Sequence, residues 1–111
     1  MQSNIDEQEN ELQVIAFEII VNSGDARSQI HQSFAAMKKG EFDKATESLK
    51  GAEQSLLNAH RTQTKLLQEN AQGKVLNLDI LMIHAQDHLM TTILLQEIAQ
   101  EMLELYQRID S

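Results

Sequence analysis

The chain has 111 residues, a formal net charge of −8, and neither cysteine nor proline. A single domain of this length buries only about two-thirds of its unfolded surface, so association with further copies of the chain would add stability. The lack of cysteine excludes disulfides and thiolate metal sites, and the negative charge argues against nucleic acid or anionic membrane as a partner and favours a basic protein.

Residues 1–9 are polar and acidic, unlike a signal peptide. We expect them to form a flexible N-terminus ahead of a single domain over residues 10–109. No apolar run reaches the roughly 18 residues of a membrane span. These features predict a cytoplasmic protein that does not insert into a membrane.

The first predicted helix covers residues 10–39, where apolar residues recur at helical spacing. Its apolar stripe consists of Leu12, Ile15, Ile19, Ala26, Ile30 and Met37. Lys38 and Lys39 stand in its last turn, where cations favour the helix dipole, and Gly40 is placed to end it.

The second predicted helix covers residues 41–70. Its apolar stripe steps by three and four residues, along Phe42, Ala45, Leu49, Ala52, Leu56, Ala59, Gln63 and Leu66. Glu41 and Asp43 are acids in the first turn, where the helix dipole favours them. Gly51 lies inside this helix, at a cost of about 1 kcal/mol relative to alanine. Residues 71–76 form the expected connection to the next helix.

The third predicted helix covers residues 77–109, with Asn77 as its N-cap. A heptad seam runs along Leu81, His84, His88, Thr91, Leu95, Ile98, Met102, Leu105 and Ile109. Further apolar residues flank the seam on one side (Ile80, Ile83, Met90, Leu94) and on the other (Met82, Leu89, Ile93, Leu103). Two partner helices cover only part of such an apolar circumference. We therefore predict an all-α, antiparallel up-down-up three-helix bundle with a subunit interface built mainly from its third helix.

Polar residues interrupt these stripes at Asn22, Ser23, Gln63, His84, His88 and Thr91. With about 1.5 Å of rise per residue and short loops, the bundle should place Gln63 level with His84, and Asn22 in roughly the same layer. A shared layer of polar residues in an apolar core favours a functional site.

Asp87 lies three residues from His84 and one from His88, on the same flank as Ile83 and Met90. A carboxylate buried unpaired among such neighbours needs a donor, a cation or a proton. In a symmetric oligomer, Asp87 from each subunit could converge on the axis, where the cluster would favour a divalent cation.

Three interpretations stay open on these grounds. His84 and His88 share one helix face, which suits a structural pair as well as a site. Residues 84–88 spell H-x-x-D-H, close to the H-x-x-E-H of inverzincin metalloproteases, but the base is a shorter Asp and no downstream acidic ligand has recognisable spacing. The third interpretation is a helical adaptor that binds partners through acidic helix faces. The core of an adaptor would not need a polar layer. His31 and His60, each alone on its helix face, are expected to be structural.

The segment His84-Ala85-Gln86-Asp87-His88-Leu89-Met90-Thr91-Thr92 resembles the signature around the phosphorylated histidine of the lactose/cellobiose-class IIA proteins of the bacterial sugar phosphotransferase system. Asn22-Ser23-Gly24-Asp25-Ala26-Arg27-Ser28 is similar to the helix 1 motif of that family, and Ala59-His60-Arg61-Thr62-Gln63-Thr64 to its helix 2 motif. With Leu103-Glu104-Leu105-Tyr106, the resemblance covers residues 12–109. Ala85, where lactose-type members tend to carry glycine, leans toward the cellobiose or diacetylchitobiose branch.

The resemblance implies a phosphocarrier, a transferase component with a phosphohistidine intermediate. His84 would accept the phosphoryl group on Nε2, as a tele-phosphohistidine, from HPr and pass it to a cysteine of the cognate IIB component. The sugar, which this protein would not contact, would be a β-linked disaccharide of the cellobiose, diacetylchitobiose or lactose type. The family also implies a homotrimer with one structural Mg²⁺, held at the axis by Asp87. His88, Gln63 and Thr91 are candidate donors to the phosphoryl oxygens.

Overall fold

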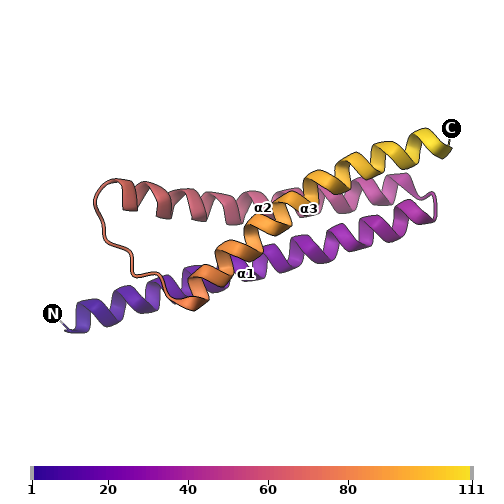
Figure 1. The fold of residues 1–111 in the computed structure, drawn as a ribbon. Coiled ribbons are helices and arrows are strands. Elements are labelled where there is room, and N and C mark those ends of the chain that lie inside the picture. Colours follow the sequence, from indigo (N-terminus) through magenta and orange to yellow (C-terminus); the bar gives the residue numbers. More distant parts are fainter. Residues whose placement is uncertain (1, 111) are drawn as a thin grey trace.

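The computed structural model describes residues 2–110, with side chains from residue 7 onward. Three helices make up the described chain: α1 (Gln2–Lys38), α2 (Phe42–Ala71) and α3 (Ile80–Asp110). They run up, down and up again along a rod of 64 × 21 × 19 Å (Figure 1). The predicted all-α three-helix bundle is thereby confirmed. None of the described helices has the length and apolar content to span a membrane.

The first helix begins at Gln2 and not near residue 10. Residues 2–9 contain several Gln and Glu, which have good helix propensity, so the helix extends outward from the bundle. The helical backbone therefore reaches through most of the segment that the sequence predicts to be flexible. Met1 lies outside the described residues, and the flexibility of residues 1–9 stays a prediction.

Glycines end both of the first two helices in the same way. Gly40 has φ of +74° and Gly73 has φ of +98°, values that residues with a Cβ rarely adopt. After α1, the N–H of Glu41 donates to Ala36 O at 2.9 Å and that of Gly40 to Met37 O at 3.1 Å. This pair of bonds is the Schellman motif, and it repeats at the end of α2. The predicted role of Gly40 is confirmed.

The start of α3 differs from the sequence prediction. The N–H of Met82 donates to the carboxylate Oδ1 of Asp79 at 2.9 Å, and the N–H of Ile83 donates to Asp79 O at 3.1 Å. Asp79 is therefore the N-cap, and the prediction of Asn77 was wrong by two residues. Both residue types favour this position.

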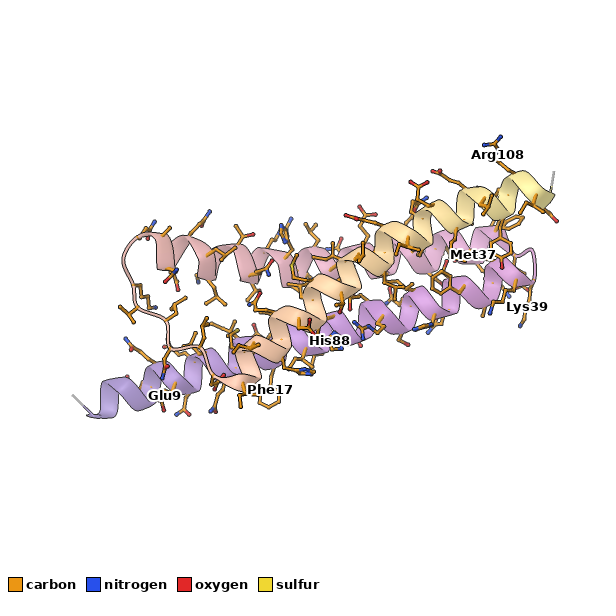
Figure 2. All side chains as sticks on the ribbon, viewed as in Figure 1. Glu9, Phe17, Met37, Lys39, His88 and Arg108 are labelled. Atoms are coloured by element: carbon orange, nitrogen blue, oxygen red, sulfur yellow. The ribbon has the colours of Figure 1, made fainter. Side chains whose placement is uncertain are left out.

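The core of the bundle follows the predicted stripe of α2 closely. The buried residues of α2 are Ala45, Leu49, Ala52, Leu56, Ala59, Gln63 and Leu66, and Phe42 packs against them at the edge. Small alanines alternate with leucines along this stripe, so α1 and α3 can approach α2 closely. Figure 2 shows the side chains that fill the space between the three helices.

The buried face of α3 is not the predicted heptad seam. It consists of Met82, Ala85, Leu89, Thr92, Ala99 and Leu103, whereas His84 and Thr91 of the seam are exposed. The buried residues repeat in the same heptad steps but stand one position later along the chain, so the predicted seam lies about 100° around the helix from the buried face. Because α3 is apolar around most of its circumference, its periodicity did not identify the side that faces α1 and α2.

The shift leaves a second apolar face on α3, which we call the outer face. It comprises Ile80, Ile83, Met90, Leu94, Ile98, Leu105 and Ile109, each between 46% and 85% exposed. A contiguous apolar surface of this length is unusual on a monomer. The prediction that α3 needs cover on more than one side therefore agrees with the exposure of these residues, while the trimer itself stays a prediction.

We expect the effect of Gly51→Ala on stability to depend on Gln29. Helix propensity alone favours alanine by about 1 kcal/mol, but a Cβ at Gly51 would meet the Gln29 amide, whose Cδ lies 3.0 Å away and whose Oε1 is closer. The substitution should therefore stabilise a Gln29→Ala protein more than the wild type. Chemical denaturation of the two single variants and the double variant measures this coupling. Equal gains in both backgrounds would show that Gln29 does not constrain the glycine.

Candidate functional site

His84 and His88 stand one turn apart on α3, on the side of the helix that borders α1. His84 is exposed and His88 is half-buried (Figure 2 labels His88). The two imidazole rings have centroids 6.0 Å apart and planes at 89°, an edge-to-face arrangement. Within the described residues no hydrogen bond holds the His84 ring. His84 is therefore the accessible imidazole of the pair, and the ring of His88 is the one that contacts its surroundings.

Arg27 of α1 reaches across to this turn of α3. Its Nη2 donates to Thr91 Oγ1 and to Thr92 Oγ1, both at 2.8 Å, and to the carbonyl of His88 at 3.5 Å. Its Nε donates to Thr92 Oγ1 at 3.2 Å. The guanidinium thus ties α1 to the turn of α3 that follows His84.

The two threonines complete this network. Thr92 Oγ1 donates to His88 O at 2.7 Å and lies 3.5 Å from Nδ1 of the His88 ring. Thr91 Oγ1 lies 2.8 Å from Asp87 O and 3.2 Å from His88 O, in hydrogen-bonding positions. Each hydroxyl therefore accepts from Arg27 and donates to the helix backbone, which satisfies polar groups at the α1–α3 contact.

Burial lowers the pKa of His88 below its ordinary 6.5, and the positive charge of Arg27 lowers it further. His84 acts in the same direction, while a hydrogen bond to the backbone and the charge of Asp87 oppose the shift. The net direction is downward, so His88 is neutral at physiological pH.

We expect the stability of the fold to rise with pH through the titration of His88. The unfolded chain takes up this proton near pH 6.5 and the folded chain at lower pH, so the contribution is present above 6.5 and lost as the pH falls through the folded pKa. Denaturation at several pH values checks this for wild type, His88→Gln and the control His60→Gln, an exposed histidine. His88→Gln should flatten the dependence; a flattening by His60→Gln instead would contradict the assignment.

Gln63 is buried at the expected level of α3 but on a different side from His84. Its Nε2 donates to Gln86 Oε1 at 2.5 Å and contacts Met90 Sδ at 3.5 Å. Gln86 lies two residues from His84, about 200° around the helix. The protomer therefore does not bring Gln63 to His84, and Asn22 is likewise absent from the site because its amide donates to Glu18 O at 3.0 Å.

Asp87 is exposed and stands within the outer face of α3, one turn from Ile83 and Met90. Within the described residues, no three His, Asp or Glu side chains lie together as a metal-binding group. A hydrolytic zinc site needs three protein ligands, so the H-x-x-D-H run has no partner in one chain to complete it. A hard carboxylate ligand fits Mg²⁺ only if further copies of Asp87 are brought beside it.

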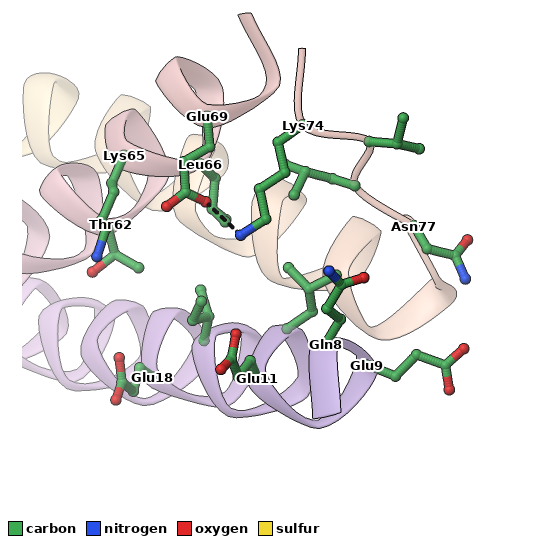
Figure 3. Close-up of a pocket in the computed structure, with 14 residues that line it drawn as sticks. Gln8, Glu9, Glu11, Glu18, Thr62, Lys65, Leu66, Glu69, Lys74 and Asn77 are labelled. Atoms are coloured by element: carbon green, nitrogen blue, oxygen red, sulfur yellow. Dashed lines mark ion pairs between the residues drawn. The ribbon is translucent and has the colours of Figure 1, made fainter. Parts of the chain in front are cut away.

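The groove drawn in Figure 3 lies away from the two histidines. It has a volume of about 290 Å³ and is formed by the first half of α1, the end of α2 and residues 74–77. Lys74 pairs with Glu69 across its rim, with Nζ and Oε2 3.5 Å apart. None of the site residues expected from the sequence lines this groove, so it does not belong to the histidine site.

Arg27 is the residue of this site that the sequence reasoning missed. Its partners lie 61 to 65 residues further along the chain, so no local pattern joins them. One signal was present, because Arg27 follows Ser23 by four residues and so extends the polar interruption of α1 by one turn.

Comparison with known proteins identifies a family that matches this chain. The family described as PTS system, lactose/cellobiose specific IIA subunit, matches residues 14–107. The lactose-specific EIIA component of Staphylococcus epidermidis is 43% identical over 89% of this chain and 95% of its own length.

Solved structures of similar proteins share the fold. PtcA from S. mutans has a TM-score of 0.87 and 55% identity, covering 88% of this chain and 96% of its own. The chitobiose IIA protein of Escherichia coli, determined in complex with HPr, has a TM-score of 0.77 and 34% identity over 90% and 97% of the two chains. The extent of these matches shows that the chain belongs to the lactose/cellobiose-specific IIA family of the phosphotransferase system.

Proposed function

We propose that this protein is a cytoplasmic phosphocarrier that accepts a phosphoryl group on Nε2 of His84 from phospho-HPr and passes it to a cysteine of a cognate IIB component. The observation that carries the proposal is the exposed His84, set beside the half-buried His88 within the family's matched region. A chitobiose IIA protein that forms a complex with HPr supports the choice of donor.

The transfer needs one nitrogen with a free lone pair. Nε2 of neutral His84 attacks the phosphorus, the bond from phosphorus to the HPr imidazole breaks, and that imidazole keeps the electron pair. Nδ1 of His84 keeps its proton throughout. The IIB cysteine then attacks the phosphorus as its thiolate, the bond from phosphorus to Nε2 breaks, and Nε2 of His84 recovers the electron pair.

The residues around His84 would serve the phosphoryl oxygens. His88 is proposed as a supporting donor because its ring faces that of His84. Thr91 is proposed as a second donor, although its hydroxyl is engaged with Arg27 in the protomer. Gln63 faces Gln86 and Met90, so a role for it would require its amide to leave those contacts.

The outer face of α3 is proposed as the interface of a homotrimer. Three outer faces meeting at an axis would bury the exposed Ile83, Met90 and Leu94. They would also bring three copies of Asp87 together. A bound Mg²⁺ would supply positive charge between these carboxylates, so Asp87 would act in assembly and not in transfer.

The sugar served by the system is proposed to be a β-linked disaccharide of the cellobiose, diacetylchitobiose or lactose type. Relatives named for lactose and chitobiose support this class. The protein itself would contact the two protein partners and the phosphoryl group, but not the sugar.

Labelling with phosphoenolpyruvate, enzyme I and HPr tests the function. The expected result is one acid-labile, alkali-stable phosphate per chain, located on His84 by mass spectrometry of peptides kept at alkaline pH. Omission of HPr is the matched control and should abolish the label. No label with all components present would favour a helical adaptor, and no label together with stoichiometric zinc would favour the hydrolase.

A further inference from the structure

Arg27 is a half-buried cation that has no acidic counter-ion among the described residues. It is half-buried between α1 and α3, and its guanidinium is surrounded by the carbonyl of His88 and the hydroxyls of Thr91 and Thr92. Among the described residues, no carboxylate forms an ion pair with it. Its positive charge is therefore solvated by neutral oxygens and not cancelled.

The guanidinium also keeps unused hydrogen-bonding capacity. Arginine has five N–H donors, and those on Nε and Nη2 make the four bonds to α3. The two N–H groups on Nη1 have no protein partner within the described part of the chain. A half-buried cation without a counter-ion costs free energy, which an apolar contact between the helices would avoid. An anion that binds near the guanidinium would supply the missing counter-charge.

The turn of α3 that contains His88 links Arg27 to His84, the proposed phosphoryl acceptor. Arg27 binds the His88 carbonyl and also Thr92 Oγ1, which lies 3.5 Å from Nδ1 of the same histidine. The His88 ring in turn stands edge-to-face with His84. A change at Arg27 would therefore move or free the ring that borders the phosphoryl site.

We propose that Arg27 is a positioning residue for phosphoryl transfer at His84. It fixes the turn of α3 from His88 to Thr92, and its uncancelled charge attracts the dianionic phosphoryl group to this side of the helix. The inference rests on the proposed phosphocarrier function and deepens it. A phosphoryl group carries its charge on three oxygens, so positive charge close to its path favours the transition state.

The test compares Arg27→Met and Arg27→Lys with the control Ser33→Ala. Ser33 is also on α1 and makes a buried interhelical bond, from Oγ to Ala45 O at 2.8 Å, but it belongs to the α1–α2 contact. Rapid-quench assays with phospho-HPr give kcat and KM, thermal unfolding gives stability, and NMR of the histidine rings reports the surroundings of His88.

Arg27→Met should lower kcat at least about tenfold, with a smaller change in KM, and should shift the ring signals of His88. Arg27→Lys keeps the positive charge but not the planar guanidinium, so its kcat should lie between those of Arg27→Met and the wild type. Ser33→Ala should lose stability while kcat and the His88 signals stay at wild-type values. Should Arg27→Met not fold, Arg27→Lys decides, because its kcat should still lie below that of wild type.

Two outcomes would overturn the inference and separate it from the proposed function. A wild-type protein that is labelled, together with Arg27 variants of unchanged kcat and unchanged His88 signals, would leave the phosphocarrier in place and remove the role of Arg27. A wild-type protein that is never labelled would remove both. Equal loss of kcat in Ser33→Ala would reduce Arg27 to a structural residue.

Discussion

His84→Ala is expected to abolish phosphoryl acceptance, with a loss of at least about a thousandfold in rate, because no other group replaces the missing nucleophile. His84 is exposed and its ring makes no hydrogen bond among the described residues, so its removal should leave the fold intact. Labelling from phospho-HPr, with circular dichroism to verify helix content, provides the measurement.

His88→Ala is the matched comparison for His84→Ala. It removes an imidazole of the same chemistry one turn further along α3, but one that is half-buried and faces Thr92. We expect the label to persist on His84 at a rate lowered by about ten- to a hundredfold, as for the loss of a supporting donor. A label that persists in His84→Ala and disappears in His88→Ala would reverse the two roles.

Leu94→Glu is expected to convert the proposed trimer to monomers. Leu94 is 56% exposed in the protomer and lies in the centre of the outer face of α3, two turns after Asp87. In a trimer that buries this face, three unpaired glutamates would be desolvated, at a cost of about 3–5 kcal/mol for each buried charge. Light scattering coupled to size-exclusion chromatography measures the mass, and the helix content should be retained.

Val75→Glu is the control for this change. It makes the same replacement of an apolar side chain by an acid, but on the connection between α2 and α3, where Val75 is 88% exposed. We expect its mass to equal that of the wild type. A Leu94→Glu protein that stays trimeric would show that the subunits meet elsewhere, and the outer face would then belong to another partner.

Asp87→Leu tests the metal within the same interface. Three carboxylates at an axis repel one another unless a cation or protons neutralise them, so leucine should keep or strengthen the trimer while bound Mg²⁺ disappears from elemental analysis. Labelling of His84 should continue. A trimeric Asp87→Leu protein with an unchanged histidine site that no longer accepts phosphate would instead make Asp87 catalytic.

The sequence predicted the helices well wherever one face alone is apolar. The stripe of α2 is flanked by charged and amide residues, so only one rotation about its axis buries Ala45, Leu49 and Leu56 together. The end of α1 was equally clear, because Gly40 is the residue that adopts positive φ at little cost. Local chemistry therefore fixed the end of α1 and the limits of α2.

The sequence was least informative for α3 and for the surroundings of its histidines. With apolar residues on every side of the helix, the period of 3.6 is satisfied by several rotations, and the contacts with α1 and α2 selected the face of Met82, Leu89 and Leu103. That selection turned His84 outward and left the outer face of α3 uncovered.

By itself, the sequence determined an acidic, all-helical chain without thiol chemistry, and the run of residues from His84 to Thr92 that carries the family resemblance. Only the tertiary structure decided that Arg27 meets this run at Thr91 and Thr92, while Gln63 meets it on another side of α3, at Gln86. The physical reason is that such contacts join side chains from different helices. Their distances depend on how each helix is rotated, which no spacing within a single helix records.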